Sequence, residues 1–371
     1  MKTKNKKTKD YSLFIGVVSF FMVLCLWIIN LSYGLSLAPD SENTRGIFGD
    51  MFGAVNALFS GLAFAGIILT LYMQRKELEL TRKDVKKTNK EFKIQNVTLE
   101  VQKFENQYYK MIDLHRANIT DIEIPFFDVL KGSSLSHDLK TDISTSNTIL
   151  RELRGKKVFV DMVKELEVCL ADSLDILKSI EPKYKKSEIF EFAYKIFFWG
   201  VNSSFAISER ILDEHQVKVK DLIRLKQKQY KEFYDISKND LKIRYMPFQG
   251  HESRLAHYYR HLFQTVKYVV QQETNKLIKY EETRQYLRIL RAQLSNAEQL
   301  MLYYNYICGF GPEWDKSGTR GNQYFTRYRM IHNMPVNRVK YVDSPREHFS
   351  DYIIDFCTKE DPLFEWGDYY E

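Results

Sequence analysis

Cysteine is scarce in this sequence, and no two cysteines lie close together along the chain. The cysteines are Cys25, Cys169, Cys308 and Cys357, which are widely separated and form no CxxC pair. This spacing favours neither a disulfide framework nor a zinc site. A reducing compartment therefore suits the chain, and we expect no bound metal.

The motifs that bind nucleotide phosphates or activate a serine are also missing. The sequence contains no G-x-x-x-x-G-K-[ST], no G-x-G-x-x-G and no G-x-S-x-G. Nucleotide-driven chemistry and serine hydrolysis therefore have no support in the sequence, and we expect no cofactor.

Proline and glycine are infrequent, with 8 and 16 residues in a chain of 371. Beyond Phe104 the apolar residues recur at helical spacing, and no run of any length alternates as a strand would. We predict a loop from Lys131 to Thr148, and a capping box of Ser295 and Glu298 that starts a helix. The predicted fold is all-α, with one helical domain over residues 104–371.

Charged residues are absent from two N-terminal stretches, Tyr11–Pro39 and Met51–Gln74. Each can provide the roughly 20 apolar residues that cross a bilayer, so we predict transmembrane helices at 11–33 and 51–73. A signal peptide is the alternative for the first, but its apolar run is longer than usual and lacks a clear cleavage site.

The charges beside these stretches give the orientation of the two predicted spans. Lysines crowd the N-terminal segment 1–10, and basic residues follow the second span, whereas the loop at 34–50 carries mostly acidic residues. By the positive-inside rule both chain termini are cytoplasmic and the loop is external. The predicted location is a bacterial inner membrane, with the lipid bilayer as a partner.

A helical stalk is predicted over residues 74–103. Apolar residues recur every seven positions, whereas the position three residues further on is polar throughout. One interpretation is a coiled coil in a homo-oligomer, and the other is a solvated helix that rests one stripe on its own domain. The apolar positions are Leu71, Leu78, Val85, Phe92 and Leu99.

Four blocks of sequence resemble the phage abortive infection proteins of the AbiC-like family. They are FENQYYKMIDLHRANI from Phe104, RGKKVF from Arg154, AHYYRHLFQTVKYV from Ala256 and YLRILRAQLSNAEQLMLYYN from Tyr286. The resemblance covers Phe104 to Pro335. It implies an antiphage protein that responds to infection, with a phage component as a partner, by arresting the host cell. It transfers no catalytic residue.

A ribonuclease is the alternative function. HEPN-type ribonucleases are helical and use an Arg-x4–6-His motif, in which the arginine holds phosphate charge and the histidine acts in 2′-OH attack. About one such match is expected by chance from the composition, so the pattern has little specificity. The chain has four: Arg210 with His215, Arg244 with His251, Arg254 with His261, and Arg327 with His332.

The best candidates among these pairs are Arg254 with His261 and Arg327 with His332. Under this alternative the enzyme needs no metal and RNA is the partner. His257 and His261 are spaced to share a metal ion, but no third ligand is evident. We favour a binding or sensing module over an enzyme.

A basic face is the remaining candidate site. Arg284, Arg288 and Arg291 fall on one side of a predicted helix, where they would bind phosphate or RNA. The competing interpretation is a solvated face that is paired with nearby glutamates.

Overall fold

A computed structural model of the chain describes residues 42–129, 148–178, 184–203, 212–232, 241–316 and 321–365, with several helical positions between 18 and 32. The predicted N-terminal segment, most of the first predicted span and Arg210 lie outside these residues. The chain divides into two compact units, Met1–Ile94 and Gln95–Glu371.

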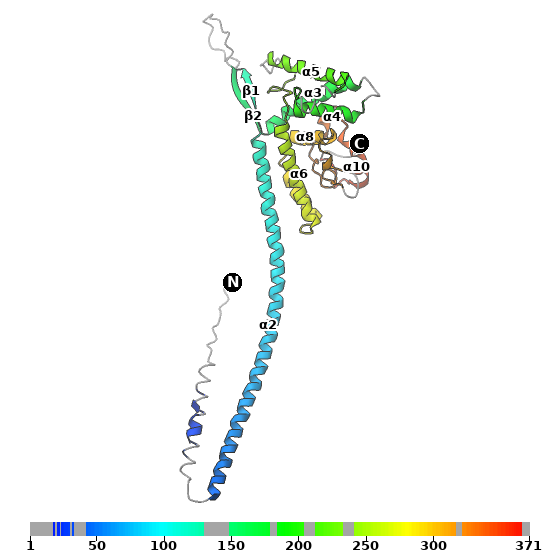
Figure 1. The fold of residues 1–371 in the computed structure, drawn as a ribbon. Coiled ribbons are helices and arrows are strands. Elements are labelled where there is room, and N and C mark those ends of the chain that lie inside the picture. The colour runs from blue at the N-terminus through cyan, green and yellow to red at the C-terminus, as the bar shows by residue number, and fades with distance from the viewer. Residues whose placement is uncertain are drawn as a thin grey trace. The chain divides into compact units, whose positions relative to one another are not determined.

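Helix α2, Glu42–Thr120, is continuous from the first unit into the second (Figure 1). It begins inside the predicted external loop and passes through the second predicted span and the stalk without a break. No proline occurs in the helix to interrupt it. Its part from Val55 onward is long and apolar enough to cross a membrane. Among the described residues this is the one such helix, so one of the two predicted spans is supported.

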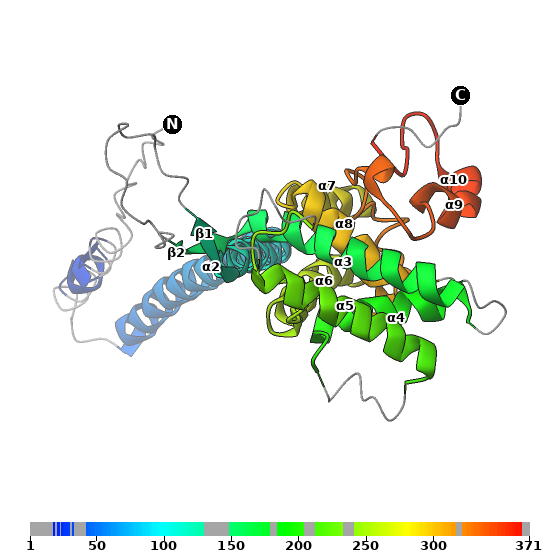
Figure 2. The ribbon, with the colours of Figure 1, turned by 90° about the horizontal axis from the view of Figure 1, so that it is seen from above.

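The second unit is built around helix α3, Lys156–Leu177. It packs against α4 (Lys186–Trp199), α5 (Glu214–Glu232) and α8 (Asn296–Ile307), as Figure 2 shows. An amphipathic helix in this central position buries its apolar stripe against several neighbours. The buried stripe of α3 includes Val158, Met162, Leu166 and Leu170.

Helices α6 (Glu252–Thr274) and α7 (Tyr280–Arg291) pack against each other next to this core. The predicted capping box at the start of α8 is confirmed: Ser295 Oγ accepts from the Glu298 N–H, and the Glu298 carboxylate accepts from the Ser295 N–H. Shorter elements follow along the chain: η3 (Pro312–Trp314), η4 (Val336–Arg338), α9 (Pro345–His348) and α10 (Ser350–Phe356).

A small antiparallel sheet corrects the all-α prediction. Strand β1 (Glu123–Val129) pairs with β2 (Thr148–Arg154), in a register that places Glu123 opposite Arg154. Pro125 and the charged residues in β2 hide the alternation of a strand, and no two-residue turn links the strands. The predicted loop lies outside the described residues except for Thr148, which opens β2.

Candidate functional site

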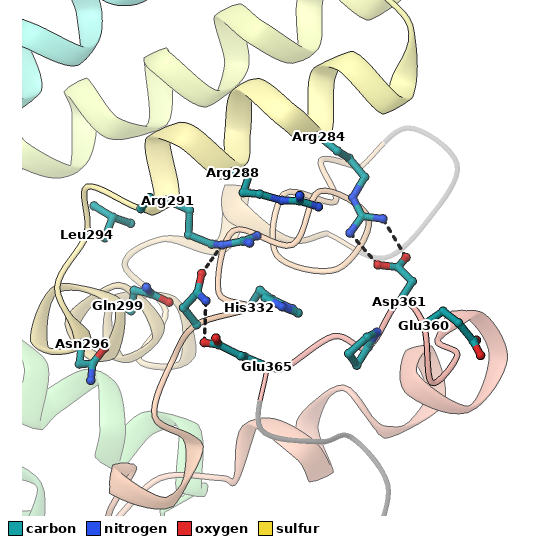
Figure 3. A pocket seen from close by; sticks show the side chains of 13 residues that line it. Arg284, Arg288, Arg291, Leu294, Asn296, Gln299, His332, Glu360, Asp361 and Glu365 are labelled. Atoms are coloured by element: carbon teal, nitrogen blue, oxygen red, sulfur yellow. Dashed lines mark hydrogen bonds and ion pairs between the residues drawn. The ribbon is translucent and has the colours of Figure 1, made fainter.

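The three arginines of the basic face lie on one side of α7. The spacing of Arg284, Arg288 and Arg291 gives them one face of a helix, and the buried Leu287 and Leu290 hold the helix against the core. Helix α7 thus directs all three arginines toward the C-terminal part of the second unit, as their side chains in Figure 3 show.

These arginines line a cavity of about 660 Å³. Helix α7 forms one wall, the first turn of α8 adds Asn296 and Gln299, and a C-terminal segment closes the opposite side. A volume of this size suits a ligand of small-molecule dimensions. The lining residues are Arg284, Arg288, Arg291, Ala292, Leu294, Asn296, Gln299, His332, Asn333, Glu360, Asp361, Pro362 and Glu365.

Arg284 forms an ion pair with a carboxylate on the opposite side of the cavity. Its two terminal nitrogens donate to the two oxygens of Asp361 at 2.8 and 2.7 Å, in the bidentate geometry that suits a guanidinium. The buried Arg329 donates to the same carboxylate at 3.1 Å. Hydrogen bonds from Arg284, followed by the charge of Arg329, hold the pKa of Asp361 below its ordinary value against the effect of burial.

Arg291 is buried but lacks a carboxylate partner. Only 7% of it is exposed, and it donates to the Asn333 side-chain oxygen and to the Arg329 carbonyl. Neither acceptor carries a charge, and no ion pair of Arg291 occurs within the described residues. Burial, and next the charges of Arg288 and Arg284, lower the pKa of Arg291 to about 10.

Two further side chains of the cavity have unused polar groups. Arg288 is exposed, and its side chain makes no hydrogen bond or ion pair with the described part of the chain. Gln299 is only 1% exposed, yet its side-chain oxygen has no hydrogen-bond partner there. An unsatisfied buried amide is unfavourable unless a ligand or water completes it.

His332 contributes an imidazole to the same cavity. Its Nδ1 lies 3.0 Å from the Leu363 carbonyl oxygen, which can only accept, so Nδ1 carries the proton. The ring lies beside the backbone of Pro362 as well as that of Leu363. Burial and then the charge of Arg291 lower the pKa of His332, so the ring is neutral at neutral pH.

The pair Arg254 and His261 makes structural contacts instead of lining this cavity. Arg254 Nε donates to the Glu123 carbonyl at 3.1 Å, and His261 Nε2 lies 3.0 Å from the Met111 carbonyl oxygen. These bonds join α6 to β1 and to α2. His257 is exposed, and the described residues contain no group of three side chains suited to a metal.

The pair Arg327 and His332 is divided between two cavities. Arg327 lines a different cavity, beside Tyr328, where it donates to Glu273 at 3.0 Å and lies 5.0 Å from the ring centre of Tyr280. His332 instead lies with Arg288 and Arg291. The ribonuclease pairings remain predictions, and the structure gives His332 different neighbours from those the motif suggests.

Sequence reasoning found the arginines of α7 and His332 separately but did not bring them together. It also missed Gln299, Asn333 and Asp361. Gln299 follows the capping box by one residue, and that pattern predicts its helix but not its neighbours. Nothing in the local sequence around Asp361 indicates a contact with α7, because the two lie far apart along the chain.

No curated protein and no solved structure matches the chain. A family model matches residues 250–339, from the start of α6 to just beyond η4. The matched stretch contains every lining residue of the cavity from Arg284 to Asn333. The resemblance inferred from the sequence is thus confirmed over these residues, which match the family described as "Putative phage abortive infection protein", putAbiC.

Proposed function

We propose that this chain is a membrane-anchored bacterial abortive infection protein whose helical domain senses infection by binding an anionic ligand. The observation that carries the proposal is the buried Arg291, which forms no ion pair with a described residue, beside the exposed Arg288 in a cavity whose basic wall lies within the matched residues. Occupation of the cavity would draw α7 and the C-terminal segment together and trigger host arrest.

The polar groups of the cavity suit binding better than catalysis. Arg284 is held by Asp361, and Arg291 is held by Asn333, so both guanidinium groups are fixed before any ligand arrives. Fixed donors reduce the entropy cost of binding an anion. A cavity whose donors are already fixed in position can bind a ligand, and binding alone requires no catalytic step.

Membrane anchoring is part of the proposal. In the part of α2 that belongs to the first unit, the apolar side chains are exposed, as lipid-facing residues are. They include Leu58, Leu62 and Ile67. Basic residues follow this stretch and the sequence before the first predicted span is rich in lysine, which supports two spans with both termini cytoplasmic. The inner membrane of a bacterium fits this arrangement.

Assembly through the stalk is also proposed. Leu78, Val85 and Phe92 are each more than half exposed on α2, which supports a second copy of the chain as the partner of this stripe. The flanks of the stripe have opposite charges: Glu77, Asp84 and Glu91 precede it in each heptad, whereas Arg75 and Arg82 follow it. In a parallel pair Glu77 of one copy would face Arg82 of the other.

A phage plating assay tests the sensing proposal. Cells that express the full chain should resist a phage, and Arg288→Ala should abolish resistance while the protein remains abundant. Arg260→Ala is the matched control, because Arg260 is an exposed arginine of the neighbouring helix α6 that does not line the cavity. Full resistance with Arg288→Ala would contradict the proposal.

A ribonuclease remains the second candidate function, and one observation favours it. The imidazole of His332 lies in a cavity that also contains Arg288 and Arg291, the residue types that metal-independent RNA cleavage requires. In that case His332→Ala and His332→Gln should both stop RNA cleavage after infection. Intact cellular RNA in infected wild-type cells that still arrest would exclude it.

A further inference from the structure

We propose that the ligand of the α7 cavity is a small phosphorylated molecule of the nucleotide class, with its phosphate at Arg288 and Arg291 and its hydroxyl or amino groups at the opposite wall. This inference rests on the proposed sensing function and specifies the ligand. Three independent features of the cavity lead to it.

The first feature is that no carboxylate contacts Arg291, because Glu365 acts on its charge from beyond Asn333, which is hydrogen-bonded to both. A guanidinium that is 93% removed from solvent is unfavourable unless a negative group compensates it, and its two protein acceptors are neutral. Its second terminal nitrogen, Nη2, makes no hydrogen bond within the described residues. A phosphate between Arg291 and Arg288 would provide the charge and accept from both.

The second feature is the start of α8. Asn296 is the first residue of this helix and lines the cavity, so the start of α8 borders the same space as the arginines. Next to it the buried Gln299 has an amide oxygen without a partner. That amide oxygen can accept from a hydroxyl or amino group of a ligand.

The third feature is the acidic opposite wall. Glu360 and Glu365 are both exposed at the cavity, and neither forms an ion pair with a described residue. Glu365 accepts from the Asn333 amide at 2.7 Å and retains its other oxygen. Carboxylates would repel a ligand that is anionic along its whole length, but they accept well from hydroxyl and amino groups.

Together these walls fit a ligand with one anionic end and one end rich in hydrogen-bond donors. A nucleotide has this division between its phosphate and its ribose and base. The volume of about 660 Å³ lies within the range of cavities that hold such small molecules.

Binding to the purified full chain in detergent tests the inference. The probes are ribonucleoside monophosphates, the matching nucleosides, inorganic phosphate and a short single-stranded RNA, and the measurement is equilibrium dialysis. We expect at least one monophosphate to bind at least ~10-fold more tightly than both its nucleoside and inorganic phosphate, since each wall then contributes.

The variants should separate the two walls of the cavity. Arg288→Ala should weaken the monophosphate ~10-fold or more and leave nucleoside binding little changed. Gln299→Leu, which keeps the side-chain volume, should weaken both compounds. Arg260→Ala should alter neither. Arg288→Lys retains the charge and should recover part of the affinity, and retained nucleoside binding shows that the Ala variant is folded.

Other outcomes would overturn the inference. Equal binding of inorganic phosphate and monophosphate would leave a simple phosphate site, and binding of the RNA alone would point to a polymer. A nucleotide affinity that Arg288→Ala leaves unchanged would place the ligand elsewhere.

The same variants keep this inference distinct from the sensing proposal. If Arg288→Ala loses nucleotide binding but still protects against phage, the ligand class is right and the sensing role is wrong. If no probe binds but Arg288→Ala loses protection, the cavity senses a ligand of another class.

Discussion

Arg284 and Asp361 are 77 residues apart in sequence and form a bidentate ion pair across the cavity of α7. The pair fixes the C-terminal segment that contains Asp361 to the helix that provides the basic wall. Arg329 donates to the same carboxylate, so one aspartate accepts hydrogen bonds from two arginines.

Replacing that aspartate should loosen the C-terminal wall. Asp361→Asn keeps the shape but removes the charge opposite Arg329, which is buried. Since the Asp361 side chain is partly exposed, we expect a loss of roughly 1–2 kcal/mol in unfolding free energy, between the values of exposed and fully buried pairs. Denaturant unfolding of the full chain in detergent measures it, with Glu360→Gln as the neighbouring control.

The same variant has a predictable dependence on pH. The pKa of Asp361 is lowered in the folded chain, so its stabilising effect is present above the pKa of an unfolded aspartate, ~3.9. It is lost as the pH falls through the lower folded value. The stability difference between wild type and Asp361→Asn should therefore be constant near neutrality and shrink below about pH 4. A difference that grows on acidification would contradict this assignment.

His261 should prove to be a structural residue. His261→Ala removes the hydrogen bond to the Met111 carbonyl and should cost about 1 kcal/mol, as should Arg254→Ala through its bond to Glu123. Any loss of phage protection should then follow the loss of protein, measured by immunoblot beside plating. A stable, abundant His261→Ala protein without protection would restore this pair as a catalytic candidate.

Pairing of the stalk can be tested on α2 itself. Phe92→Lys puts a charge into an apolar layer and should lower the oligomer mass of the detergent-solubilised protein. Ile94→Lys is the matched control, because Ile94 is also apolar and exposed but lies off the seven-residue stripe. In a parallel pair, Phe92→Cys should form a disulfide between copies and Ile94→Cys should not. Unchanged mass with Phe92→Lys would favour a single solvated helix.

The proposed membrane topology predicts the response of two reporter fusions. A reporter after Glu371 should behave as cytoplasmic, and one inserted near Asn43 as external, because positive residues remain inside. The reverse result would overturn the orientation. Since α2 already begins at Glu42, a second insertion before that residue would show whether the helix start affects the outcome.

Local patterns in the sequence predicted much of the helical domain. The apolar spacing of α6 and α7 and the capping box of Ser295 with Glu298 depend on neighbours within a turn or two, and the structure contains them. The β1–β2 pair was missed because its strands are short, partly charged and distant in sequence.

The composition of the cavity could not be predicted in the same way. It depends on the return of the chain to α7 near Asp361, and no periodicity near either residue indicates that contact. His332 was selected for its spacing from Arg327, but tertiary packing places it beside Arg291 instead. Helical spacing identified the arginines because all three belong to one helix.

The two walls of the cavity differ in their relation to the matched family segment. The arginine wall lies inside residues 250–339, whereas Glu360, Asp361 and Glu365 lie beyond them. Under the proposed sensing function, changes in a short C-terminal stretch would alter what the protein recognises without disturbing the helices that hold the arginines. For bacteria under attack by rapidly changing phages, that separation would let one scaffold acquire new triggers through few mutations.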